Sequence, residues 1–169
     1  MARDQPGGRA VPRQDHLGPQ ARRGPGLEGR RVSGPEDLVT AYAAAVDARD
    51  WVALADLFVE DGALITPDPP RSLEPVIASI GRDAIVATVR KVEGFAGTDH
   101  VVDSTHWQVD GSAASGLTIG QAHHHVDGPE PHSWVWYVEY RDDAVRTEAG
   151  WRFATRRLTL ARIEKQPRP

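Results

Sequence analysis

The stretch from Thr98 to His125, TDHVVDSTHWQVDGSAASGLTIGQAHHH, decides the fold expected for this chain. Two runs rich in β-branched residues flank Asp110-Gly111, a dipeptide that favours the tight turn of a β-hairpin. Because a hairpin brings its far ends together, His100 near its beginning is expected close to three histidines at its end, His123, His124 and His125. The stretch therefore predicts paired antiparallel strands that end in a cluster of imidazoles.

The composition predicts one globular domain. Hydrophobic side chains make up 40% of the 169 residues and charged ones 26%, which is enough apolar material for one core. Cysteine is absent, and this favours a reducing cytoplasmic location. No apolar run approaches the ~20 residues that span a bilayer, so no membrane association is expected.

The charge is unevenly distributed along the chain. Residues 1–32 hold seven Arg, three acidic residues, six Gly and four Pro, which predicts a disordered basic tail. This tail carries +4 and the whole chain −4, so the remainder carries −8 and is a poor candidate for nucleic-acid binding. We expect the folded domain over residues 33–165 and a short C-terminal tail over 166–169.

The first part of the domain predicts helices. Ser33 and Glu36 form a capping-box pattern before a helix over 35–49, whose apolar face holds Leu38, Tyr42, Ala45 and Val46. A second helix is expected over 51–59, a short strand over 63–66, a proline-rich loop over 67–71 and a third helix after Gly81.

From residue 98 the apolar period changes from 3.6 to about 2. Strands are expected over 99–109, 112–126, 132–146 and 150–163. Helices followed by antiparallel strands indicate an α+β fold, in which a curved antiparallel sheet wraps around three N-terminal helices as a cone with one open end.

Several motifs resemble one known family. The segments YAAAVDARDW (42–51) and YRDDAVRTEAGWRFATRR (140–157), the Asp-Gly hairpin and the His-rich strand end are similar to the SnoaL-like family of the nuclear transport factor 2-like superfamily. The resemblance covers roughly residues 35–163 and is strongest to its scytalone dehydratase-like branch. It implies an interior pocket in which Asp47, His100 and either His124 or His125 act on a bound water and the substrate.

The resemblance and the chemistry of these side chains predict a small, cofactor-free enzyme. An Asp hydrogen-bonded to a His fixes its tautomer and raises its basicity, and such a His can remove a proton α to a carbonyl. A dehydratase, cyclase or isomerase acting on a hydrophobic, cyclic or polyketide-like substrate is therefore expected. Tyr42, Trp51 and Trp107 are the candidate substrate-binding residues, and no metal site is expected.

Some assignments stay open from the residues alone. Helical periodicity places Asp50 nearer the apolar stripe than Asp47. Strand alternation sends His124 to one face and its two neighbours to the other, without showing which face is interior. Arg156 and Arg157 must likewise point to opposite faces, and an interior arginine would need an acidic partner. His123, His125 and His100 could ligate zinc, but no supporting metal motif accompanies them.

Two other functions fit the same cone. One is a non-catalytic module for small-molecule binding or assembly, and the other is the small structural subunit of a ring-hydroxylating oxygenase. The strand over 132–146 is rich in Trp and β-branched residues, so one face of the sheet is expected to pack against another protein surface rather than face solvent. A homodimer through the sheet is therefore expected.

Overall fold

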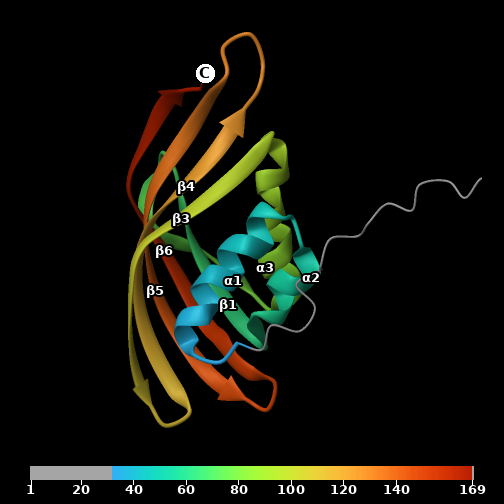
Figure 1. Ribbon diagram of the computed structural model, residues 1–169, viewed down its shortest axis with the longest axis vertical. Coiled ribbons are helices and arrows are strands. Elements are labelled where there is room, and N and C mark those ends of the chain that lie inside the picture. The colour runs from blue at the N-terminus through green and yellow to red at the C-terminus, as the bar shows by residue number, and fades with distance from the viewer. Residues whose placement is uncertain (1–31, 169) are drawn as a thin grey trace, which may run out of the picture.

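The computed structural model describes residues 32–168, which form a curved six-stranded sheet with helices against its concave face (Figure 1). The predicted tail lies outside these residues except for Val32, which is buried in the core. The elements are α1 (Pro35–Asp47), α2 (Trp51–Asp56), β1 (Phe58–Asp68), β2 (Ser72–Ile80), α3 (Arg82–Val89), the 3-10 helix η1 (Arg90–Gly94), β3 (Gly97–Asp110), β4 (Ala113–Val126), β5 (His132–Thr147) and β6 (Gly150–Pro167).

The strand order is β2-β1-β6-β5-β4-β3, and all neighbours are antiparallel except β1 and β6. The α+β cone is thus confirmed, with one parallel pair in an otherwise antiparallel sheet. Strand β6 runs to Pro167, so the first residues of the expected C-terminal tail extend the last strand. No helix within residues 32–168 is long and apolar enough to cross a membrane.

The start of α1 differs by one residue from the prediction. The carboxylate of Asp37, not Glu36, accepts hydrogen bonds from the backbone N–H groups of Ser33 (2.9 Å) and Gly34 (3.3 Å). Gly34 is therefore the N-cap. The predicted apolar face of the helix is confirmed, because all four of its members are buried: Leu38, Tyr42, Ala45 and Val46.

The region between α1 and α3 was predicted least well. The second helix ends at Asp56, because Phe58 enters β1, where it pairs with Phe153 and is fully buried. Strand β2 was missed, since its sequence SLEPVIASI contains a proline; it lies at the sheet edge, where proline is tolerated. Pro67 belongs to β1, at an irregularity in its pairing with β2.

A β-bulge in β3 controls the geometry of the hairpin. Thr98 is opposite His124 and His100 is opposite Ala122, but Ser104 is opposite Ile119, so β3 holds one extra residue between Val102 and Ser104. Even-numbered residues of β3 therefore face the helices before the bulge, and odd-numbered ones do so after it. The bulge is what turns His100, rather than Asp99, into the cone.

Gly120 makes this bulge possible, because a Cβ at that position would collide with the carbonyl oxygen of Val101. Gly120→Ala is expected to lower the free energy of unfolding by about 1–3 kcal/mol, the usual cost of forcing extra atoms into a packed site. Gly94→Ala is the matched control: nothing lies within 4 Å of its added Cβ, and its effect should stay within about 0.5 kcal/mol. Urea unfolding of both variants tests this, and equal stabilities would contradict it.

Candidate active site

An aspartate and a histidine meet on the concave side of the sheet. Asp47 is the last residue of α1, and His100 lies near the start of β3, which packs along that helix. The Asp47 Oδ1 atom lies 2.6 Å from His100 Nδ1. The same carboxylate accepts hydrogen bonds from the His100 backbone N–H and from the Thr98 hydroxyl, both at 2.9 Å. These contacts hold the imidazole ring in one orientation.

The electrostatics of Asp47 favour its ionised form. Partial burial by itself raises the pKa of a carboxyl, but the hydrogen bonds from His100 and Thr98 outweigh it and leave the pKa of Asp47 below its usual value. An ionised Asp47 accepts the proton on Nδ1 of His100, so Nε2 carries the free lone pair. The His100 side chain is 11% exposed and that of Asp47 26%, so the pair is largely but not wholly shielded from water.

A small cavity of about 20 Å³ lies beside this pair, roughly the space of one water molecule. His100 forms part of its wall. Other side chains of the wall come from α1, β4, β5 and β6, and these include Tyr42, Thr118, Tyr140 and Arg156. The prediction that Tyr42 lies in the pocket agrees with this placement. Tyr140 was not singled out from the sequence, although its register on β5 places it opposite the buried Thr118.

Arg156 is the interior member of the Arg156-Arg157 pair, and it is 1% exposed. Its guanidinium carbon lies 3.8 Å from the ring centroid of Tyr140 and 4.3 Å from that of Tyr42, which are cation–π distances. Its acidic partner is the buried Asp142, at 3.6 Å. The expectation that one arginine is interior and paired with an acid is therefore confirmed.

This buried ion pair is incompletely hydrogen-bonded. Among the described residues, both carboxylate oxygens of Asp142 and the Nε and Nη1 atoms of Arg156 have no hydrogen-bond partner. Burial raises the pKa of Asp142 to about 6, although Arg156 acts in the opposite direction. Burial also raises the pKa values of Tyr42 and Tyr140, so both phenols keep their protons at neutral pH.

His124 is the histidine of the triplet that faces the interior. It is 3% exposed and packs at tilted angles between the rings of Phe95 and Trp136, with centroid distances of 4.8 Å and 4.6 Å. Burial and the nearby His100 lower the pKa of His124 to about 4, so its ring is neutral at pH 7. Its Nδ1 atom has no hydrogen-bond partner within residues 32–168, yet the side chain does not line the small cavity.

His125 points to the opposite, convex face, which argues against the alternative that it occupies the pocket. Its Nδ1 atom is 2.8 Å from the Ser133 hydroxyl, and its Nε2 atom is 2.6 Å from the Asp99 carboxylate. Ser133 is buried within the strand ladder and does not line the small cavity, so these three residues connect β3, β4 and β5 rather than form a nucleophilic site. His123 has the same strand parity as His125.

Three further predicted positions lie away from the cavity. Asp50 caps α2 by accepting a hydrogen bond from the Ala53 N–H (3.0 Å), so Asp47 is the carboxylate that meets the histidine. The Trp51 indole donates to Glu93 (2.9 Å) near the surface. Trp107 packs over Gly116 and donates to the Thr105 hydroxyl (3.0 Å), so neither tryptophan touches the small cavity.

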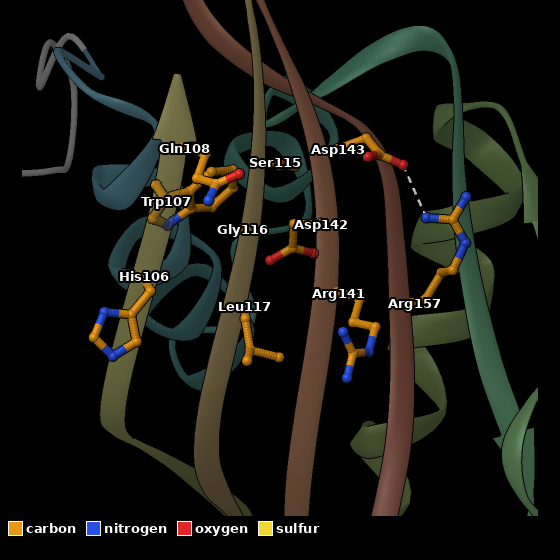
Figure 2. Close-up of a pocket in the computed structure, with 10 residues that line it drawn as sticks. All are labelled: His106, Trp107, Gln108, Ser115, Gly116, Leu117, Arg141, Asp142, Asp143 and Arg157. Carbon is orange, nitrogen blue, oxygen red and sulfur yellow. Dashed lines mark hydrogen bonds and ion pairs between the residues drawn. The ribbon is translucent and has the colours of Figure 1, made fainter. Parts of the chain in front are cut away.

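A larger groove of about 430 Å³ lies over β3 to β6 (Figure 2). Figure 2 shows Arg157 and Asp143 pointing toward each other, and they form an ion pair at 2.8 Å. His106, Gln108 and Arg141 add further polar groups. This groove holds no carboxylate–imidazole pair, so the smaller interior cavity is the better candidate site. Within residues 32–168, no group of three or more His, Asp or Glu side chains is arranged to hold a metal ion.

An α+β cone of this strand order defines a known class of small domain, and comparisons with known proteins agree with the fold. A family model described as a SnoaL-like domain matches residues 36–157. The chain therefore belongs to the SnoaL-like family, within the nuclear transport factor 2-like superfamily. A search of curated protein sequences found no significant match.

Solved structures with similar folds include proteins named for different activities. A putative scytalone dehydratase from Novosphingobium aromaticivorans is 26% identical, with a TM-score of 0.65 over 76% of this chain and 83% of that one. The Kfla4162 protein from Kribbella flavida is 22% identical (TM-score 0.67; 76% and 89% covered). A hexachlorocyclohexane dehydrochlorinase, LinA type 2, is 15% identical (TM-score 0.63; 79% and 86% covered). The last two similarities show the fold alone.

Proposed function

We propose that this protein is a small acid–base enzyme of the dehydratase or isomerase type, acting on a hydrophobic cyclic or polyketide-like ketone. The observation that carries the proposal is the 2.6 Å contact between Asp47 Oδ1 and His100 Nδ1 beside an interior cavity. The similarity to a putative scytalone dehydratase supports the same reaction class. The reaction needs no redox step, and its proton transfers lie within the reach of an imidazole.

In the proposed reaction, His100 is the general base and Asp47 positions it. Nε2 of His100 removes a proton from the carbon α to the carbonyl, and the electron pair moves onto the carbonyl oxygen as an enolate. When the enolate collapses, the bond to a β-hydroxyl breaks. The His100 imidazolium protonates the leaving hydroxide, so that water leaves and the neutral imidazole is restored. In an isomerisation, the same imidazolium returns the proton to the γ-carbon instead.

Three side chains can stabilise the enolate oxygen in this scheme. Arg156 forms part of the cavity wall and has an unpartnered Nη1, while Tyr42 and Tyr140 keep their hydroxyl protons at neutral pH. Donors fixed in a dry site stabilise a developing negative charge more strongly than water does. The neutral His124 is the candidate for a second proton-transfer group, because it lies on the same face of the sheet as His100.

We also propose that two copies associate through the convex face of the sheet and that the enzyme works in the cytoplasm. Val101 and Ile119 on this face are 47% and 38% exposed, and the groove over the same sheet carries both arginines and carboxylates, a charge pattern suited to a symmetric contact. Light scattering at micromolar concentration checks the association. A monomer under these conditions would contradict it.

The enzymatic proposal is tested with β-hydroxy cyclic ketones and β,γ-unsaturated cyclic ketones, followed by enone absorbance and by deuterium incorporation in D₂O. We expect the wild-type protein to turn over at least one class and His100→Ala to lose that activity. His106→Ala is the matched control, because His106 lies on the convex face. Ligand binding without turnover by any variant would favour the non-catalytic module instead.

A further inference from the structure

The interior cavity reaches the protein surface along one seam. Its wall includes Thr118 and Arg156, each 1% exposed, and also Val102, which is 39% exposed and lies on the helix-facing side of β3. One continuous void thus connects the deepest polar residues of the cone with solvent. The surface end of this void lies between α1 and β3, where the half-buried Ala43 faces the bulged part of the strand.

The topology places this seam where it can open. Strand β3 is the last strand of the sheet, so no further strand covers its outer side (Figure 1). The bulge disrupts the regular ladder next to Val102 and shifts the local backbone. In contrast, the C-terminal end of α1 is tied to β3 by the hydrogen bonds of Asp47 with Thr98 and His100. The seam is therefore held closed at the Asp47–His100 pair and is less constrained at Ala43.

The cavity is too small for an organic ligand, so binding of one would require it to widen. About 20 Å³ holds one water molecule, whereas pockets for organic ligands measure roughly 300–1,000 Å³. We propose that the seam between α1 and the bulged strand β3 is the entrance to the interior site, and that Ala43 and Val102 at its rim select ligands by size. This inference rests on the proposed function for its substrate, but the entrance itself can be tested without any substrate.

The absence of cysteine from the whole chain provides the assay. Thr118→Cys places a single thiol on the cavity wall, and Ala144→Cys places one in the main core, where Ala144 is 1% exposed. Each full-length variant is treated with a small methanethiosulfonate and, separately, with a bulky maleimide, and labelling is followed by mass spectrometry. We expect the Thr118→Cys variant to react with the small reagent at least tenfold faster than the Ala144→Cys variant, whose labelling reports global unfolding.

Rim substitutions then locate the entrance. In the Thr118→Cys background, Val102→Phe is expected to slow labelling by about tenfold, and Val102→Ala is expected to admit the bulky maleimide faster. Phe95→Ala is the comparison variant, because Phe95 contacts His124 just after η1, away from the seam and from the cavity wall. It should leave the labelling rate unchanged.

Two outcomes would overturn the inference: equal labelling of the thiols in the two cysteine variants, or acceleration by Phe95→Ala with no effect of either Val102 variant. The result is separable from the proposed function. If labelling depends on Val102 but no ketone is turned over, the entrance stands and the enzymatic proposal fails. If ketones are turned over and the labelling rate is the same in both Val102 variants as without them, the enzymatic proposal stands and the entrance lies elsewhere.

Discussion

Asp47→Asn is expected to lower turnover by about 10²–10⁴-fold while the protein stays folded, because it disables His100, and a well-placed general base contributes about that much. The carboxylate of Asp47 accepts the Nδ1 proton of His100 at 2.6 Å. An asparagine amide can present either its oxygen or its NH₂ group to that nitrogen, so it no longer specifies the tautomer with a free Nε2. The loss should appear in kcat more than in KM, because Asp47 acts through His100 rather than on the substrate.

A purely structural role for Asp47 would not change the imidazole itself, so the state of His100 is the second readout. Nitrogen-15 NMR of the His100 ring should show the Nδ1–H form in the wild-type protein and a mixture of forms in Asp47→Asn. Asp50→Asn is the matched control, because asparagine caps helices as well as aspartate does. Equal turnover of Asp47→Asn and Asp50→Asn would remove Asp47 from the mechanism.

Arg156→Met is expected to lower the free energy of unfolding by about 3–5 kcal/mol at pH 7, because it breaks the buried ion pair with Asp142. The variant also loses the cation–π contacts with Tyr42 and Tyr140. Arg157→Met is the matched control. Its ion pair with Asp143 is exposed at 42% and 53%, and removing such a surface pair costs about 0–1 kcal/mol.

The cost of Arg156→Met should depend on pH. Since the pKa of Asp142 is raised to about 6 in the folded protein, its contribution to stability is fully present below about pH 4 and is lost as pH rises through 6. Removing the arginine raises this pKa further, so up to about 1.4 kcal/mol of the cost at pH 7 comes from Asp142 taking up a proton, and this part disappears near pH 5, where Asp142 is largely neutral in both proteins. Urea unfolding at both pH values tests this. A cost independent of pH would show that packing, not charge, is what Arg156 provides.

The sequence allowed good prediction of the elements with clear periodicity. The four C-terminal strands, the apolar face of α1 and the opposite facing of His124 and its neighbours follow from spacings of two or 3.6 residues. The region over 56–80 was harder, because β1 carries Asp61-Gly62 and β2 carries Pro75, residues that ordinarily interrupt strands. Their extended conformation depends on pairing with distant segments, which no local pattern reports.

The residues of the candidate site likewise divide into those that the sequence identified and those that it did not. The motif resemblance selected Asp47, His100 and Tyr42, whereas Tyr140 and Asp142 were not identified as site residues, because their significance lies in the contact each makes with Arg156 across the sheet. The choice between Asp47 and Asp50 was open in the sequence, since both lie near one face of a helix. It was decided by where α1 ends: Asp50 lies beyond the helix and caps the next one.

By itself, the sequence determined that two strands meet at Asp110-Gly111, that His100 begins one of them and that a histidine triplet ends the other. Only the tertiary structure decided which of these side chains enter the cone. A single extra residue in β3 reverses the facing of the strand between Val102 and Ser104, and the missing side chain of Gly120 leaves room for it. The alternation of side chains has a period of two, so one bulge places His100 inside against Asp47 and sends Asp99 outward to His125.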